Sequence, residues 1–485
     1  MRLWQLRTPL HQSWHFTAFC LSIVLGLGLS VLPFASIFAN QMWLVMAIVI
    51  FGFVLWKRWR WLIVITTIAG CLFGLSRGSV DIEQRAIYKQ YFGKMVRLEG
   101  DLSEDVDKGK KGETVLRLSN IAHNGQKLPA EIWVTTRVEA DMMRGDRITV
   151  TGKVSSGFGS FAASIYSANI EHIGRHGRGD VAVRSRDDFG EKVRAAIDEP
   201  AASLGMGFLT GQRRSLPTEL DLALLTAGLT HIVVASGYNL TILVRFIKRL
   251  FDKKSRYLTV LLSIMLVTGF MFITGHSPSM VRAGLIATMS LIAWYFGRSF
   301  HPATLLCFAA AATGLWNPSY VWGNLGWQLS FAAFAGVMIL SPLLQAYFFG
   351  NQKPHWLRQL AGETIAAQIA TAPLLLYAFG QISNVAIIAN LAVLPLVPLA
   401  MLLTFLTGLT SYLVPFLAEI IAMPTQLLLD YMVWVTKQTA GLDWAISAWP
   451  LPFVGLVASY VILIAFCWWM KRASKYSLRQ SNIID

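Results

Sequence analysis

The chain has 485 residues, of which 54% are hydrophobic and only 14% are charged. Soluble proteins carry about 25% charged residues, so this composition excludes an ordinary soluble domain and predicts that most of the chain faces lipid. The formal net charge of +15 fits a nucleic-acid ligand or an anionic membrane surface. Basic loops that merely orient a membrane protein give the same value, so the charge alone does not separate these explanations.

The chain begins with a three-helix membrane segment, residues 1–80. Arg2 and Arg7 precede the first apolar run, as in a signal peptide, but no small-residue cleavage site ends that run, and we expect a retained helix. Because a bilayer core needs roughly 20 apolar residues per helix, the later runs predict about twelve transmembrane helices. The apolar runs lie at 14–36, 40–56, 60–76, 228–250, 257–275, 279–297, 301–317, 322–342, 361–380, 384–409, 412–436 and 452–470.

Lysine and arginine in the short loops predict the orientation, because cytoplasmic loops are enriched in them. With the N-terminus inside, the opposite short loops hold little beyond Arg77 and Lys437. Both termini are therefore predicted in the cytoplasm, and the polar segment 90–185 on the outer side of the membrane. The predicted cytoplasmic residues are Lys57, Arg58, Arg60, Arg245, Lys248, Arg249, Lys253, Lys254, Arg256, Arg298, Lys353, Arg358, Lys471 and Arg472.

The outer segment 90–185 has the pattern of a small β-barrel. Alternating β-prone runs lie at 95–102, 114–121, 131–138, 147–154 and 165–173, separated by turn residues. Five short strands in about 80 residues favour an OB-like barrel, a fold that binds single strands or saccharides. Its acidic and basic residues nearly balance, so a purely structural cap is an equal alternative to a ligand-binding domain.

Two features follow the barrel. The first is a basic stretch that predicts either outer contacts with a polyanion, such as a nucleic acid, or, more commonly, a solvated linker; its residues are Arg175, Arg178, Arg184 and Arg186. The second is the region 186–218, where apolar residues at helical spacing are interrupted by Pro200, Gly205 and Gly207. This pattern predicts an amphipathic helix lying at the membrane interface.

The segment 228–239 reads Gly-Leu-Thr-His-Ile-Val-Val-Ala-Ser-Gly-Tyr-Asn, and lipid contact alone does not explain its polar and small residues. It resembles the signature of the ComEC competence family, proposed DNA-uptake channels of natural transformation. The resemblance implies a polytopic channel domain at 219–472, followed by a cytoplasmic tail at 473–485. Further matches follow in order at 278–283 (Pro-Ser-Met-Val-Arg-Ala), at Asn317-Pro318 with 326–331 (Gly-Trp-Gln-Leu-Ser-Phe), at 368–373 (Gln-Ile-Ala-Thr-Ala-Pro), and at Asn390 before Pro395.

The sequence departs from the family pattern in two ways. The family motif usually has a histidine where this chain has Asn239, which keeps a hydrogen-bonding group but not a titratable one. Many family members also continue into a metallo-β-lactamase-like domain, whereas this chain has no His-x-His-x-Asp-His run. We therefore expect no catalytic activity, and a separate protein would supply any nuclease.

Metal and cofactor chemistry is not expected. His172 and His176 lie four residues apart without a convincing third ligand, so solvated surface histidines are the better explanation. A nucleotide-binding Gly-x-x-x-x-Gly-Lys-Ser/Thr loop does not occur in the sequence. All cysteines lie in apolar runs, where a free thiol behaves as a small hydrophobe; they are Cys20, Cys71, Cys307 and Cys467.

Polar residues within apolar runs are the candidate channel-lining residues, because a conduit for a polyanion needs polar groups or cations along its wall. Arg282 leads, with pore lining and a structural ion pair to Glu363 or Asp221 as equal alternatives. His231, Ser236 and Asn239 share a segment that Gly228 and Gly237 could break, and broken helices usually line cavities. Interhelical hydrogen bonding is the alternative for that segment. Gln328 and Gln368 are weaker candidates, more typical of packing and kinks.

The resemblance implies single-stranded DNA as the substrate, with membrane lipids, an extracytoplasmic DNA receptor, a separate nuclease and a cytoplasmic ATPase or helicase as partners. Two alternatives remain open. One is a small-molecule or lipid-linked saccharide transporter, in which the barrel binds sugar. The other is a non-transporting scaffold of an uptake machine, for which the polar residues within the spans would be costly without a purpose.

Overall fold

A computed structural model describes residues 11–57, 59–109, 112–138, 142–174, 181–213, 215–233, 237–251, 253–275, 277–298, 301–350 and 354–474. The chain forms two compact units. The first comprises Met1–Arg184 with Ala303–Gln328, and the second comprises Ser185–Pro302 with Leu329–Asp485.

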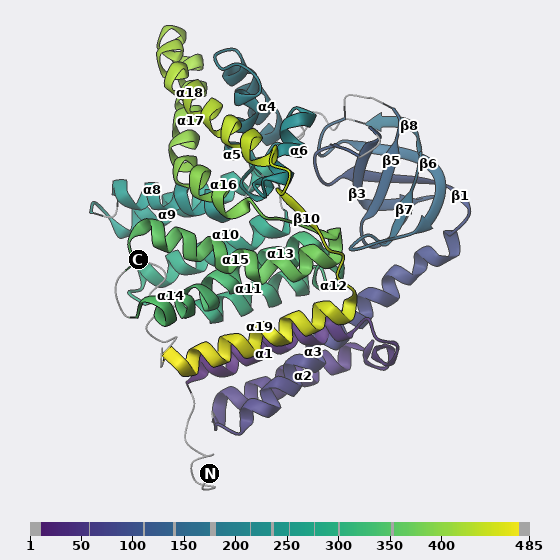
Figure 1. Cartoon of the computed structure of the whole chain (residues 1–485). Helices are drawn as coiled ribbons and strands as arrows, with labels where there is room; N and C mark the ends of the chain where they lie inside the picture. The colour runs from purple at the N-terminus through teal and green to yellow at the C-terminus, as the bar shows by residue number, and fades with distance from the viewer. Residues whose placement is uncertain are drawn as a thin grey trace. The chain divides into compact units, whose positions relative to one another are not determined.

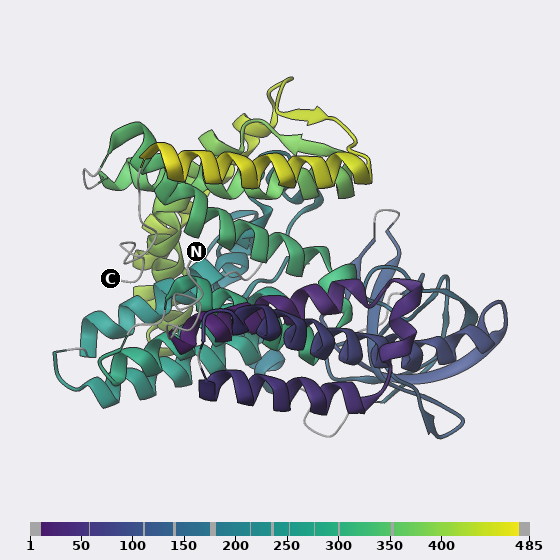
Figure 2. The same ribbon diagram turned by 90° about the horizontal axis from the view of Figure 1, so that it is seen from below.

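The helices of the first unit pack through small residues. A Cβ on Gly26 would lie 2.2 Å from the Cys71 carbonyl oxygen, and one on Gly74 would lie 2.1 Å from that of Ile23. Glycine therefore lets α1 and α3 touch backbone to backbone, as in membrane helix pairs (Figures 1 and 2). The helices are α1 (Gln12–Leu29), η2 (Pro33–Phe38), α2 (Gln41–Lys57), α3 (Leu62–Arg85), η3 (Ala86–Tyr91), α11 (Pro302–Trp316) and α12 (Ser319–Gly323), followed by the start of α13 (Leu325–Ala335).

A small β-barrel follows η3. Strand β1 pairs with β3 and β6, β3 with β5, β5 in parallel with β7, and β7 with β6, so five strands close a ring. Alternate side chains such as Leu98, Leu116, Val134 and Ile148 fill its interior. The strands are β1 (Met95–Leu102), β2 (Asp107–Lys108), β3 (Thr114–His123), β4 (Gln126–Lys127), β5 (Ile132–Thr136), β6 (Arg147–Ser156), β7 (Ala163–Ile165) and β8 (Asn169–Gly174).

The first four predicted strands correspond to β1, β3, β5 and β6, but the predicted fifth strand is two. Residues 163–165 close the barrel as β7, and 169–174 pair with β6 as β8. Ser167 between them has φ 54, a left-handed conformation that interrupts an extended strand. Periodicity alone did not reveal this break.

The second unit is helical, and its core surrounds α5. Leu204, Met206 and Phe208 of α5 are buried against residues of α6, α17 and α18. The elements are α4 (Val181–Arg194, which begins in the first unit), α5 (Ala201–Thr210), α6 (Thr218–Thr226), α7 (Thr230–Val233), α8 (Gly237–Phe251), α9 (Arg256–Thr274), α10 (Pro278–Tyr295), the rest of α13, η4 (Gly336–Leu340), α14 (Ser341–Phe349), α15 (Trp356–Phe379), β9 (Gln381–Ser383), α16 (Ala386–Val393), η5 (Leu394–Leu396), α17 (Val397–Leu413), α18 (Pro415–Ala440), β10 (Ile446–Ala448) and α19 (Phe453–Ser474).

The region 186–218 differs from the predicted interfacial helix. It holds the end of α4, all of α5 and the start of α6, and nine of the ten residues of α5 are buried. An interfacial helix would leave one face free for lipid headgroups. The glycines at 205 and 207 instead allow close packing, since a Cβ on Gly207 would lie 2.4 Å from Val233 Cγ1.

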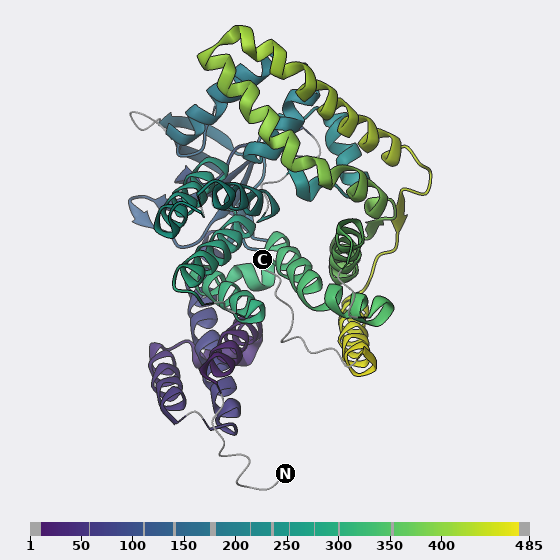
Figure 3. The same ribbon diagram turned by 90° about the vertical axis from the view of Figure 1, so that its left-hand side faces the viewer.

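The helices α17 and α18 form a hairpin that runs across the direction of α15 and α19 (Figures 1 and 3). The hairpin, with α16 before it, is enclosed between β9 and β10, which pair antiparallel with Ile446 opposite Ser383. The chain therefore returns near residue 445 to the place that it left near residue 384.

Among the described residues, seven helices are long and apolar enough to cross a membrane, judged by length and composition. Four shorter apolar helices accompany them: Gln41–Lys57, Ala201–Thr210, Ser279–Tyr295 and Pro302–Trp316. The protein is thus a membrane protein with a small closed barrel. In the apolar run predicted at 228–250, α7 begins only at Thr230, after Gly228 with φ +72, and residues 234–236 between α7 and α8 lie outside the described residues.

Candidate functional site

The broken segment between α6 and α8 is the centre of the candidate site. Helix α6 ends before Gly228, which has φ +72, and α7 is a single turn that ends at Val233. Helix α8 then begins at Gly237. A left-handed φ strongly favours glycine, so the sequence itself ends the first helix there. Ser236 lies outside the described residues.

Gly228 brings a second segment to this break. A Cβ on Gly228 would lie 2.7 Å from Ala386 Cβ and 3.3 Å from Ser383 Cβ. The carbonyl oxygen of Ser383 accepts a hydrogen bond of 2.9 Å from Gln368 Nε2. The structure therefore joins two predicted site residues, Gly228 and Gln368, through Ser383, which the sequence analysis did not single out.

Several buried polar atoms near this break have no hydrogen-bond partner among the described residues. They are Thr230 Oγ1, Arg282 Nε, Gln368 Oε1, Ser383 Oγ and Asn390 Oδ1. A buried polar atom without a partner costs about 1–3 kcal/mol, so such atoms normally bind water, an ion or a ligand. Their position on α7, α10, α15, β9 and α16 indicates a polar interior in the second unit.

Arg282 lies on α10 and is 9% exposed. Its guanidinium carbon lies 5.6 Å from the ring centroid of Phe331 and 5.4 Å from that of Phe334. Gly237, the first residue of α8, lies close to Arg282, because a Cβ built on Gly237 would lie 3.5 Å from Arg282 Nη2. A cation flanked by two aromatic faces is positioned by cation–π attraction, which leaves its N–H groups available for an anion.

The carboxylates that the sequence offered as partners of Arg282 are engaged elsewhere. Asp221 accepts hydrogen bonds from Arg213 Nε at 2.6 Å and Nη2 at 2.8 Å. Glu363 accepts a bond of 2.9 Å from Gln359 Nε2. Within the described part of the chain, Arg282 forms no ion pair, so the structural ion-pair interpretation with these two residues is wrong.

Asn239 is fully buried at the start of α8. Its Nδ2 donates to the carbonyl oxygen of Phe208 at 2.9 Å. Phe208 lies in the last turn of α5, where carbonyl groups lack intrahelical donors. Asn239 therefore caps α5, and its role in lining a channel stays a prediction. An imidazole N–H, the group that the family motif usually supplies here, is also a hydrogen-bond donor.

His231 keeps an exposed side chain on α7, and its Nδ1 lies 3.0 Å from the Gly228 carbonyl oxygen. This contact orients the ring within the broken segment. Gln328 belongs to the first unit, where its Nε2 donates to the Val321 carbonyl at 2.9 Å. That bond fastens the turn between α12 and α13, as expected of a packing residue.

The structure describes two of the four arginines in the predicted outer basic stretch, and these two differ in exposure. Arg175 and Arg178 lie outside the described residues, and Arg184 is exposed on α4. Arg186 is instead 3% exposed, with Nε 3.0 Å from Asp187 Oδ1. Its guanidinium is enclosed by the helical core, so the structure does not place it on an exposed basic surface. Helical spacing turns Arg184 and Arg186 to different faces of α4.

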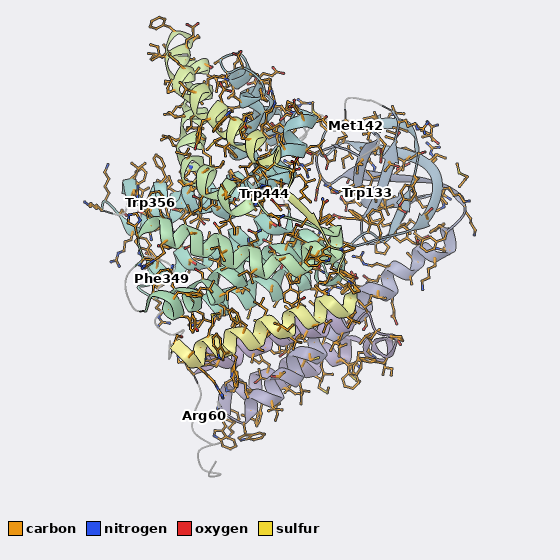
Figure 4. The ribbon with its side chains drawn as sticks, viewed as in Figure 1. Arg60, Trp133, Met142, Phe349, Trp356 and Trp444 are labelled. Atoms are coloured by element: carbon orange, nitrogen blue, oxygen red, sulfur yellow. The ribbon has the colours of Figure 1, made fainter. Side chains whose placement is uncertain are left out.

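The barrel has a mixed electrostatic surface. Burial raises the pKa of the Glu131 carboxyl, Glu104 adds to the rise, and Arg117 opposes it. Arg117 also forms an ion pair with Glu104 and lies 5.6 Å from the ring centroid of Trp133, which Figure 4 labels. Among the described residues, no group of three histidine, cysteine, aspartate or glutamate side chains is arranged to hold a metal.

Comparison with known protein families covers this part of the chain. The family model described as "Competence protein" matches residues 208–473. The chain belongs to the ComEC-type competence protein family. Arg282, Gln368 and the segment 228–239 all lie within the matched residues.

Two curated relatives are similar to parts of the chain. "ComE operon protein 3" of Bacillus subtilis (strain 168) is 30% identical over 175 residues, which cover 35% of this chain and 19% of that protein. An "Uncharacterized protein" of Aquifex aeolicus (strain VF5) is 24% identical over 284 residues, which cover 58% of this chain and 63% of that protein. The match thus spans less than two thirds of each relative, and no solved structure matches the chain.

Proposed function

We propose that this competence-family protein is a channel that carries single-stranded DNA across the bacterial cytoplasmic membrane during natural transformation. The observation that carries the proposal is Arg282, a buried guanidinium held between Phe331 and Phe334 beside a broken helix. A cation suits the phosphate of a nucleotide, and aromatic faces suit its base. The polar atoms without partners around Gly228 support a hydrated path for the same polyanion.

The barrel would act before the channel. Its strand order, with a parallel pair between β5 and β7 closing the ring, supports an OB-like fold, a class that binds single strands. DNA that reaches the outer surface would be oriented by the barrel, pass the segment 228–239 and leave among the basic inner loops. An outer DNA receptor, a separate nuclease and a cytoplasmic ATPase or helicase would act with it.

We further propose about twelve membrane-embedded helices, with both termini in the cytoplasm and the barrel outside. The distribution of lysine and arginine in the short loops supports this orientation. The pairing of β9 with β10 supports a hairpin of α17 and α18 that leaves and returns on one side. Two crossings of the bilayer cancel, so α19 keeps the same orientation whether both helices of this hairpin cross the bilayer or neither does.

The test compares a deletion strain complemented with wild type, Arg282→Gln or Arg282→Lys. Transformants are counted, and labelled DNA is measured at the cell surface and in the cytoplasm. Loss of one charged contact corresponds to a loss of at least about tenfold, so we expect Arg282→Gln to trap DNA outside and Arg282→Lys to retain part of the uptake. Membrane abundance of each variant is measured in parallel.

Arg298→Gln is the matched control, since Arg298 is an exposed arginine just beyond the end of the same helix. It should transform normally. Normal transformation with both Arg282→Gln and His231→Ala would contradict the channel proposal. If the deletion itself leaves DNA uptake unchanged, saccharide export becomes the activity to measure.

A further inference from the structure

Arg85, at the end of α3, gathers contacts from three separate stretches of the first unit. Its Nε lies 2.5 Å from Asp81 Oδ2, and its Nη1 donates to the Ser160 carbonyl at 2.7 Å. Its Nη2 donates to Asn317 Oδ1 at 3.2 Å and to Ser319 Oγ at 3.0 Å. The side chains of Arg85 and Asp81 are 14% and 13% exposed. One guanidinium thus connects a membrane helix, a barrel loop and the Asn317-Pro318 turn.

The barrel loop at this contact, residues 157–162, is fixed to the barrel wall. The rings of Phe158 and Phe161 each lie edge-on to Trp133 of β5, with centroids 5.3 Å apart. The Ala162 amide donates to the Glu131 carbonyl at 2.9 Å. Because these contacts pack the loop against β5, we expect the loop and the strand to move together.

The opposite side of the contact is shaped to receive the loop. A Cβ on Gly323 of α12 would lie 2.2 Å from the Gly159 carbonyl oxygen, so two backbones meet there. Asn317 Oδ1 accepts from the Ser319 amide at 3.3 Å and from its hydroxyl at 2.7 Å. That turn presents Asn317 and Ser319 to Arg85 at the start of α12.

We propose that Arg85 is a positioning residue that clamps the β6–β7 loop of the barrel to α3 and to the Asn317-Pro318 turn. The clamp fixes the barrel on the membrane helices of its own unit. The guanidinium is required because its planar fork serves four acceptors in different directions, which a lysine ammonium on a flexible stem does not. The consequence for DNA entry rests on the proposed function, whereas the clamp itself does not.

The clamp is tested by amide hydrogen exchange on the full chain in nanodiscs. Arg85→Gln should raise exchange in residues 157–162 and 317–323 by about tenfold or more, because it removes the charge-assisted bonds that hold both segments. Arg85→Lys should give an intermediate value. Arg77→Gln is the matched control, because Arg77 lies on the same helix, 4.0 Å from the same Asp81 carboxylate.

A covalent substitute for the clamp tests its role in DNA entry. Ser319 Oγ lies 3.4 Å from the Ser160 carbonyl oxygen, so Ser160→Cys with Ser319→Cys introduces thiols in two residues that are in contact, which a short bifunctional reagent with a reducible linker can join. The pair is introduced with Arg85→Gln after the four native cysteines are replaced. Crosslinking should restore slow exchange and DNA uptake, and reduction should remove both. The same pair with Arg85 intact is the control.

The outcomes separate the two proposals. Unchanged exchange in Arg85→Gln overturns the clamp. Raised exchange with DNA uptake equal to wild type overturns the positioning role, as does restored slow exchange without restored uptake. If the wild-type protein supports no DNA uptake, the proposed function fails, while the exchange measurement still decides the clamp.

Discussion

Arg85 in the first unit and Arg282 in the second show how differently this protein uses the same side chain. Arg85 has a carboxylate and three further acceptors from its own unit. Arg282 has two aromatic faces, and its Nε has no hydrogen-bond partner among the described residues. A cation whose hydrogen bonds are made within the protein stabilises the fold, whereas a cation that forms no ion pair within the protein can bind an external anion.

The largest stability loss is expected at the break in the second unit. Gly228→Ala places a Cβ in the left-handed region, which costs about 1–2 kcal/mol, and against Ala386, where overpacking costs about 1–3 kcal/mol more. Gly297→Ala is the control, because Gly297 also has a positive φ but nothing lies within 4 Å of its Cβ position. Equal shifts of the thermal midpoint in detergent would show that the contact with Ala386 is not tight.

Removal of the satisfied arginine should also destabilise the protein. Arg85→Gln loses hydrogen bonds to a charged group, each of which contributes about 1.5–3 kcal/mol. The loss is measured by thermal unfolding of the purified chain. A midpoint as high as that of wild type would mean that the contacts of Arg85 contribute nothing to folding, and the contrast between the two arginines would fail.

The cap on α5 provides an intermediate effect. Asn239→Ala leaves the Phe208 carbonyl without its donor and should cost about 1–3 kcal/mol. Asn239→Asp should cost more, because a carboxylate would then face that carbonyl. Asn239→His keeps a donor and should recover part of the loss. Reduced DNA uptake with unchanged stability in Asn239→Ala would instead indicate a lining role.

Replacement of Arg282 should have the opposite effect on stability. Replacing a buried charge by an apolar side chain of similar volume is often neutral or stabilising. Arg282→Met should therefore keep or raise the unfolding midpoint while DNA uptake falls. A fall in both together would show that Arg282 has a structural partner and would remove the contrast with Arg85.

The smallest effect concerns pH and the barrel. The folded pKa of Glu131 is raised, so the stability from this group is complete below its unfolded pKa of about 4.3 and is lost as pH rises through the folded value. Glu131→Gln should therefore unfold at a slightly higher temperature than wild type at neutral pH, with the difference disappearing in acid. Glu171→Gln, which removes an exposed ion pair with Arg97 and leaves an amide oxygen to accept from Thr151, should show no such gain.

The sequence by itself determined the membrane class, the first four barrel strands and the segment 228–239 as the distinctive feature. Each is a local signal: apolar run length, alternation along a strand, or glycine and polar residues within an apolar run. The family resemblance rested on the same local order of residues. The helix end at Gly228 is a local signal of the same kind, since a left-handed turn depends on the residue that occupies it.

Only the tertiary structure decided which polar groups have a hydrogen-bond partner. Arg85 and Asn317 are 232 positions apart, and Asn239 reaches Phe208 from 31 positions away, so no periodicity connects them. The direction of α17 and α18, which runs across that of α15 and α19, was equally invisible, because an apolar run has a length but no direction. Hydrogen-bond partners and helix directions are set by packing between distant segments, and packing is the part of folding that composition and spacing do not specify.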